Sequence, residues 1–149
     1  MNNWSGIWDK VLKMAALAGG AIAGAMGGWD TVLIVLCYMM AIDYVTGWIC
    51  GAMGKSPKTE GGKLDSKTGW NGLLKKAVML VVVFMAAQLD RVMPEGTRVF
   101  RDAMAMFYVA NEGLSITENL AIIGVPFPAF IQKALEQLKQ KNDEGTEKE

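Results

Sequence analysis

The sequence contains no histidine among its 149 residues. Histidine is the side chain most often used as a general base and a common zinc ligand, so its absence removes the Ser–His nucleophile pair and most zinc sites. The chain also has no complete phosphate-binding loop, because the stretch GAMGKS at residues 51–56 lacks the spacing of that motif. We therefore expect no enzyme activity, no cofactor and no metal ion.

Net charge and cysteine are scarce as well. The chain has 15 lysines and arginines and 15 aspartates and glutamates, so its formal net charge is zero. A strongly basic surface that binds nucleic acid is therefore not expected. The two cysteines, Cys37 and Cys50, lie in one apolar run that is predicted to be a single helix, so they cannot form a disulfide with each other.

Long apolar runs, in contrast, are abundant. Hydrophobic residues make up 52% of the chain, and the charged residues gather between the runs, as is typical of a membrane protein. The sequence predicts an all-α, polytopic membrane protein whose transmembrane domain covers residues 1–128. About four transmembrane helices are expected, over residues 11–28, 31–53, 71–89 and 99–125. The second run covers about 35 Å as a helix, enough for a hydrocarbon core of about 30 Å.

The two ends of this domain are less regular. The first run covers only about 24 Å between residues 13 and 28, so that it either spans the bilayer or lies in its interface. Pro126 and Pro128 prevent the fourth run from continuing as a helix. Residues 129–149 are then predicted to form a cytoplasmic amphipathic helix, on the membrane or against a partner, with a polar and disordered tail from about residue 141.

Basic residues predict the orientation. The loop at residues 54–76 contains six lysines but only two acidic residues, so the positive-inside rule places it in the cytoplasm. With four spans, both termini are then cytoplasmic. Tryptophans flank the runs, as expected for rings that prefer the lipid headgroup level: Trp4, Trp8, Trp29, Trp48 and Trp70.

Small residues recur at every fourth position of the first run. Glycine inside a helix costs roughly 1 kcal/mol relative to alanine in water, so the repetition needs a reason. Between helices in lipid, small residues allow close approach of the backbones. We interpret the row, and a shorter one in the second run, as packing surfaces within one subunit or between subunits. These residues are Ala16, Gly20, Gly24 and Gly28, then Gly47 and Gly51.

Ionisable residues occur at the predicted membrane depth. Asp43 lies in the middle of the second run and shares a helical face with Thr46, Gly47 and Cys50. A carboxylate at that depth costs roughly 2.5–3.5 kcal/mol on insertion scales and is functional by default. The fourth run adds further polar residues, and we take the set as pore or gating candidates: Asp43, Asn111, Glu112, Ser115 and Glu118.

Two questions about these residues stay open at the level of sequence. Their carboxylates either line an aqueous path or oligomer contact, or form buried ion pairs, for which Lys75 or Arg101 are available partners. The fourth run is either one continuous helix or two helices that meet at residues 111–113, because residues 115–118 have the pattern of a capping box.

Several stretches resemble the toxin secretion/phage lysis holin family, bacteriophage holin family 4. They are DYVTG at 43–47, SKTGWNGLLKK at 66–76, QLD at 88–90, and NEGLSITENLAIIGVPFP at 111–128 followed by KALEQLK. The resemblance covers roughly residues 32–139. It implies a homo-oligomer in the bacterial cytoplasmic membrane that opens a pore and releases an endolysin, or exports a large toxin, without binding that cargo specifically.

The residues themselves leave other functions open. A small ion channel or transporter subunit would use Asp43 and Glu112 as cation or proton sites. An antiholin-like membrane scaffold would recruit a partner through its C-terminal helix and would form no pore. The expected partners are the lipid bilayer and further copies of the chain, and not nucleic acid.

Overall fold

The computed structural model describes residues 4–94 and 96–146, and all regular structure within these ranges is helical. The all-α prediction is therefore confirmed. The helices are α1 (Trp4–Ala25), α2 (Thr31–Ala52), α3 (Ser66–Asp90), α4 (Val99–Ile123) and α5 (Ala129–Thr146).

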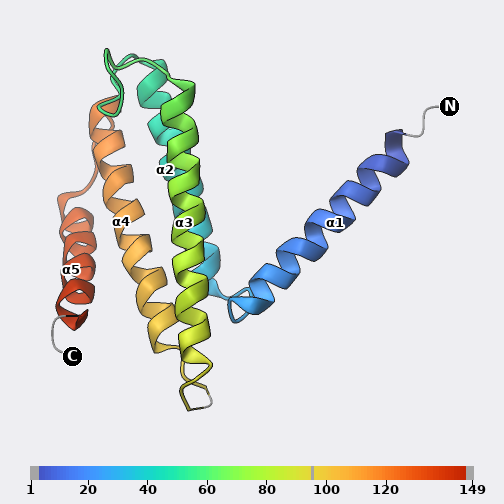
Figure 1. Cartoon of the computed structure of the whole chain (residues 1–149). Helices are drawn as coiled ribbons and strands as arrows, with labels where there is room; N and C mark the ends of the chain where they lie inside the picture. The colour runs from blue at the N-terminus through green and yellow to red at the C-terminus, as the bar shows by residue number, and fades with distance from the viewer. Residues whose placement is uncertain (1–3, 95, 147–149) are drawn as a thin grey trace.

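Helices α2, α3 and α4 form a bundle, and α4 lies between α5 and the other two helices (Figure 1). Both α2 and α3 pack along α4, whereas they contact each other far less. The apolar core is built from Leu33, Leu36 and Met40 of α2, Met79 and Val83 of α3, and Ala105 and Val109 of α4, together with Met26. Alanines on α3 and α4 let the backbones approach closely, as small residues do between membrane helices.

Side-chain caps fix where these helices begin. Asp30 accepts a hydrogen bond from the backbone N–H of Leu33 at 3.0 Å and so caps α2. Asp65 does the same for α3 through Thr68 at 2.8 Å. The start of α4 is held from another helix, because the carboxylate of Asp90 at the end of α3 accepts hydrogen bonds from the first turn of α4.

Helix α4 is continuous from Val99 to Ile123, which answers the open question of a break at residues 111–113. It ends at Gly124, whose φ of 93° lies in the left-handed region that favours glycine. Pro126 and Pro128 then keep the chain from continuing as a helix, as expected.

Helix α1 projects away from the bundle (Figure 1). It begins and ends earlier than expected, at Trp4 and Ala25, and most of its described side chains are exposed. The change of direction before α2 occurs at Gly27 and Gly28, whose φ values of 91° and 100° need glycine. In the described residues, α1 contacts the bundle mainly through its C-terminal end, at Ala23 and Met26.

The number of membrane spans differs from the expectation. Two helices in the described residues, α2 and α3, are long and apolar enough to cross a bilayer, instead of four. Helix α1 is not apolar enough to cross a bilayer by this measure. Glycine and alanine are only weakly apolar, and its N-terminal half carries Asp9, Lys10 and Lys13. Helix α4 is not apolar enough either, because polar side chains occur along it from Arg101 to Asn119. Length and apolar composition therefore support two membrane spans in the described residues and not the expected four.

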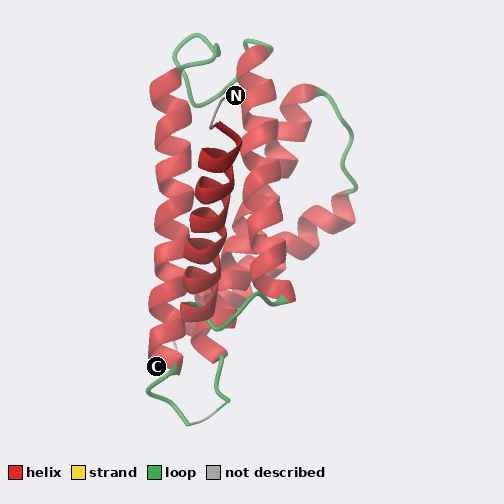
Figure 2. Ribbon diagram, turned by 90° about the vertical axis from the view of Figure 1, so that its right-hand side faces the viewer, coloured by secondary structure: helices red, strands yellow, loops and turns green. Residues whose placement is uncertain are grey.

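Helix α5 folds back along α4 and runs antiparallel to it (Figures 1 and 2). Leu135 lies against Gly113, where a Cβ would be 2.9 Å from Cδ2 of Leu135. Phe130, near the start of the same helix, is 74% exposed. The helix continues to Thr146, past residue 141 where the polar tail is expected to begin, and residues 147–149 lie outside the described ranges.

Candidate functional site

A buried ion-pair network joins the three helices of the bundle. Lys76 of α3 places its Nζ 2.8 Å from Oδ2 of Asp43 on α2 and also contacts Oε2 of Glu112 on α4. The exposed fractions of these three side chains are 11%, 10% and 4%. One ammonium thus bridges carboxylates that lie 69 positions apart in the sequence.

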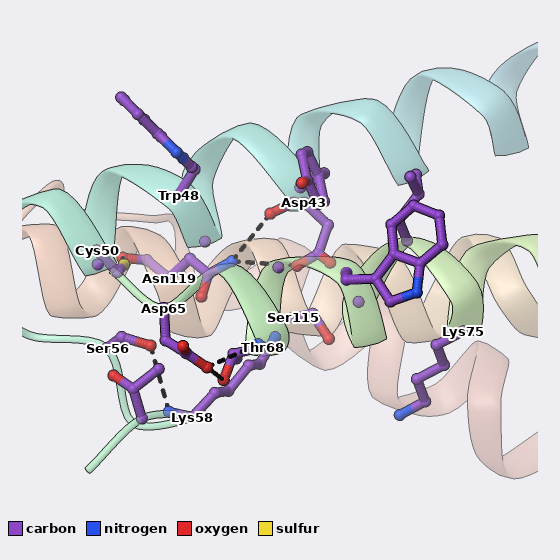
Figure 3. Close-up of a pocket in the computed structure, with 18 of the residues that line it drawn as sticks. Asp43, Trp48, Cys50, Ser56, Lys58, Asp65, Thr68, Lys75, Ser115 and Asn119 are labelled. Atoms are coloured by element: carbon purple, nitrogen blue, oxygen red, sulfur yellow. Dashed lines mark hydrogen bonds between the residues drawn. The ribbon is translucent and has the colours of Figure 1, made fainter. Parts of the chain in front are cut away.

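Neutral polar groups complete the network (Figure 3). Nδ2 of Asn119 donates to Oδ1 of Asp43 at 3.1 Å and to Oγ1 of Thr46 at 3.0 Å. The Sγ of Cys50 donates to the backbone oxygen of Asn119 at 3.4 Å. Asp43, Thr46 and Cys50 all face α4, so the small, polar helix face predicted from their spacing is the one that packs against protein.

The charges in this network are unequal in number. Two carboxylates share one ammonium, so that the fully ionised network has an excess negative charge in a region of low exposure. A buried pair of this kind adds little net stability compared with apolar packing, but removal of one partner typically costs about 3–5 kcal/mol. The network therefore holds the three helices in one register and is sensitive to any change in its charge.

A cavity of about 550 Å³ extends from this network towards the loop at residues 54–65. It lies between α2 and α3 and is lined by both carboxylates, by loop residues and by the first half of α3. Figure 3 shows Asp43, Asn119 and Ser115 along it, with Lys58 and Lys75 also at the pocket. The loop closes on the helices through Leu64, which packs on Gly51.

Of the five predicted pore or gating residues, four lie at the network or the cavity and one does not. Asp43 and Glu112 lie in the network, and Asn111 and Ser115 line the cavity while half-buried. Glu118 is exposed and does not line the cavity. The structure therefore brings four of the five pore or gating candidates together.

The cation that pairs with the two carboxylates differs from those suggested by the sequence. Neither Lys75 nor Arg101 pairs with Asp43 or Glu112, and Lys76 does so instead. One feature of the sequence could have indicated Lys76. Asp65 and Thr68 form an N-cap, so α3 begins at Ser66 and Lys76 lies inside the helix. Asn119 is not among the site residues that the sequence suggested, although it lies on the polar fourth run, four positions after Ser115.

Arg101 belongs to a second polar cluster at the opposite end of the bundle. Its guanidinium makes two hydrogen bonds to Asp30, of 2.6 and 2.9 Å, and its Nε donates to the backbone oxygen of Met26 at 2.6 Å. The hydrogen bonds from Arg101 are the main reason why the pKa of Asp30 is lowered to about 2. Arg98 and Arg91 donate to further backbone oxygens at the end of α1, so this cluster fixes the point at which α1 leaves the bundle.

The predicted packing glycines have different surroundings. A Cβ at Gly47 would lie 3.6 Å from Asn119, and one at Gly51 would lie 2.8 Å from Leu64, so both face other parts of the chain. Nothing lies within 4 Å of a Cβ built at Gly20 or Gly24 of α1. The same is true of Gly28, but this residue lies in the turn after α1 and is not part of a helical row, contrary to the expectation. Ala16 is exposed on the same helix. Within the described residues, the row on α1 has no packing partner.

The described ranges contain no group of three or more histidine, cysteine, aspartate or glutamate side chains that could hold a metal ion. The charged side chains of the network can form ion pairs, bind protons and be solvated. These interactions respond to electric fields and to the separation of helices.

Comparison with known proteins gives a consistent result. A family model described as "Bacteriophage holin family" matches residues 20–140. An uncharacterised 14.9 kDa protein encoded 3′ of nagH in Clostridium perfringens is 44% identical over 77% of this chain and 82% of its own length. Another uncharacterised protein of that species, from strain 13, is 42% identical over 78% of this chain and 82% of its own length.

One relative carries a functional name. A protein of Bacillus phage phi105, named a probable holin, is 40% identical over 78% of this chain and 81% of its own length. No solved structure matches the chain significantly.

Proposed function

Because this chain belongs to the bacteriophage holin family, we propose that it is a holin that assembles with copies of itself in the bacterial cytoplasmic membrane and opens a pore there. The pore releases an endolysin to the cell wall, or exports a large toxin, without specific binding of that cargo. In this proposal the chain is not an enzyme, and its chemistry is association between helices.

The observation that carries the proposal is the network of Asp43, Lys76 and Glu112 inside helices with apolar outer surfaces. The outer faces of α2 and α3 expose large hydrophobic side chains such as Val45, Val78 and Val81. Such continuous apolar surfaces are expected to be covered by lipid or by other subunits. The charged groups point inward, where a rearrangement between subunits can expose them to water and so line a pore.

The arrangement in the bilayer follows from the same contacts. Helices α2 and α3 cross the membrane, and α4 crosses with them because its polar stripe is shielded by both. The lysine-rich loop at residues 54–65 faces the cytoplasm. If α1 also crosses, the N-terminus is cytoplasmic, and if α1 lies in the outer interface, it is external. Helix α5 begins after the cytoplasmic end of α4.

Self-association is supported by α1. Its row of Ala16, Gly20 and Gly24 is exposed and has no partner in the described chain. In lipid, a small-residue face gains stability only when another helix backbone approaches it closely. A neighbouring copy of the chain supplies such a helix.

One observation favours an ion channel as a second possibility. The cavity connects the loop at residues 54–65 with the buried carboxylates, as a cation pathway would require. A channel passes small ions but retains proteins, whereas a holin pore passes both.

Release from lipid vesicles separates these functions. The purified full-length chain is added to vesicles that contain both potassium ions and a folded fluorescent protein, and both are followed over time. We expect simultaneous release of the two. Release of potassium alone supports the channel, and retention of both solutes supports a scaffold without a pore; either result contradicts the holin proposal.

A further inference from the structure

The cavity between α2 and α3 has a charge pattern that the ion-pair network does not explain. Four lysines line it, Lys58, Lys63, Lys75 and Lys76, together with three carboxylates. Each carboxylate already has a partner. Asp43 and Glu112 pair with Lys76, and Asp65 accepts hydrogen bonds from the backbone N–H and the hydroxyl of Thr68.

The other three lysines are not neutralised in this way. Among the side chains of residues 6–94 and 96–140, no carboxylate lies within ion-pair distance of Lys58, Lys63 or Lys75. All three are exposed, and they approach the cavity from the loop and from the first half of α3. They therefore add positive potential to the cavity and leave ammonium donors available for an anion.

Hydroxyl groups line the cavity near Lys58, at the end closed by the loop (Figure 3). Ser56, Ser66 and Thr68 also line it. A phosphate diester presents one negative charge and several oxygen acceptors, which matches a combination of ammonium and hydroxyl donors. At about 550 Å³, the cavity has the size of a typical site for a small ligand.

Apolar residues at the rim indicate what the phosphate is attached to. Trp48 and Trp70 line the cavity and are 58% and 60% exposed, and Leu73 beside them is also exposed. Tryptophan prefers the headgroup level of a bilayer, and basic pockets between helices on the cytoplasmic side suit anionic lipid headgroups. Acyl chains can leave the cavity along the apolar outer faces of α2 and α3.

We propose that the cavity between α2 and α3 binds the phosphate group of an anionic amphiphile, with Lys58, Lys63 and Lys75 as its cationic contacts. A phospholipid of the cytoplasmic leaflet and a free phosphate ester share this chemistry. The exposed tryptophans favour the lipid. The bound headgroup would bridge the loop and α3 next to the buried network, so occupancy would favour the arrangement in which Asp43, Lys76 and Glu112 are paired.

The experiment titrates the delipidated full-length chain in a neutral detergent and counts bound molecules by native mass spectrometry. The probes are phosphatidylglycerol, phosphatidylcholine and glycerol phosphate. We expect phosphatidylglycerol to bind at least tenfold more tightly than phosphatidylcholine. Tighter binding of phosphatidylglycerol than of glycerol phosphate identifies a lipid as the source, and equal binding identifies a free phosphate ester. No preference for phosphatidylglycerol over phosphatidylcholine would overturn the proposal.

The loop supplies a matched control for non-specific charge attraction. Lys63→Gln/Lys75→Gln removes two lysines that line the cavity, whereas Lys55→Gln/Lys67→Gln removes two exposed lysines of the same region that do not. The first variant should weaken phosphatidylglycerol binding about tenfold more than the second. Equal weakening in the two variants would assign the attraction to surface charge and contradict a site in the cavity. Helical content, measured by circular dichroism, verifies that both variants are folded.

Discussion

The Nζ of Lys76 lies 2.8 Å from Oδ2 of Asp43, and the same ammonium also contacts Glu112. The interaction joins α3 to α2 and α4 with a single cation between two acids. Loss of the cation and loss of one acid therefore have different consequences. Without Lys76 two carboxylates face each other unpaired, whereas without the charge of Asp43 the remaining pair is balanced.

The first prediction concerns the stability of this network. Lys76→Met should lower the free energy of unfolding by about 3–5 kcal/mol, because it leaves buried charges uncompensated. Asp43→Asn should lower the free energy of unfolding much less. The triple variant Lys76→Met/Asp43→Asn/Glu112→Gln should recover most of the stability that Lys76→Met loses. Unfolding in detergent measures these differences. Lys75→Met, at an exposed neighbouring position, is the control, and an equal effect of the two lysine substitutions would contradict the role assigned to Lys76.

The second prediction concerns acid. Arg101 lowers the pKa of Asp30 from its ordinary value of 3.8 to about 2, so folding favours the ionised form. The resulting stabilisation is fully present above about pH 4 and is lost as the pH falls through about 2. Asp30→Asn should therefore cost about 1–2 kcal/mol near neutral pH and almost nothing at about pH 2. Unfolding of both chains as a function of pH measures the difference. A difference that persists at pH 2, or that survives in an Arg101→Met background, would refute this coupling.

The third prediction concerns the exposed small-residue row of α1. Gly20→Leu or Gly24→Leu adds bulk where nothing in the described chain makes contact, so the stability of the monomer should not fall and should rise by up to about 1 kcal/mol, because a helical glycine is removed. The distribution of crosslinked oligomers in membranes should shift, and lysis time with it. Ala18→Leu, at an exposed position on the opposite side of α1, should leave both unchanged. Identical crosslinking in all of these variants would show that the row does not mediate association.

The fourth prediction concerns gating by Asp43. Movement of one charge through the full membrane field changes the free energy by about 2.3 kcal/mol per 100 mV. In an oligomer this energy is multiplied by the number of subunits. Asp43→Asn removes the excess negative charge on which the membrane field acts, at a much smaller cost to folding than Lys76→Met, so lysis should begin later. Membrane accumulation should be normal, and an uncoupler should advance lysis less than in the original chain. The exposed Glu118→Gln is the control. Unchanged lysis time and uncoupler response in Asp43→Asn would exclude a gating role for this charge.

Sequence patterns were sufficient for several features of this molecule. The apolar runs predicted where the four helices α1 to α4 lie, and the spacing of Asp43, Thr46 and Cys50 predicted the buried face of α2. These features depend on local periodicity and composition, which a single chain displays directly.

Features that depend on tertiary contacts were not predictable in the same way. Lys76 follows another lysine at the edge of the basic loop, and only its place in the third turn of α3 turns it towards Asp43. Arg101 has several acidic residues within reach by sequence, and its choice of Asp30 depends on how the two ends of the bundle meet. The amphipathic pattern of α5 indicated an apolar face but not that Gly113 of α4 would receive Leu135.

The most direct test of the proposed holin function is induced expression of the full-length chain in a bacterium with and without a cytoplasmic endolysin. Turbidity and membrane potential are recorded together. The account predicts a sudden loss of membrane potential in both strains and an abrupt fall in turbidity only in the strain that contains the endolysin. If the chain accumulates in the membrane while potential stays at the uninduced level and the endolysin strain does not lyse, the protein does not form a holin pore.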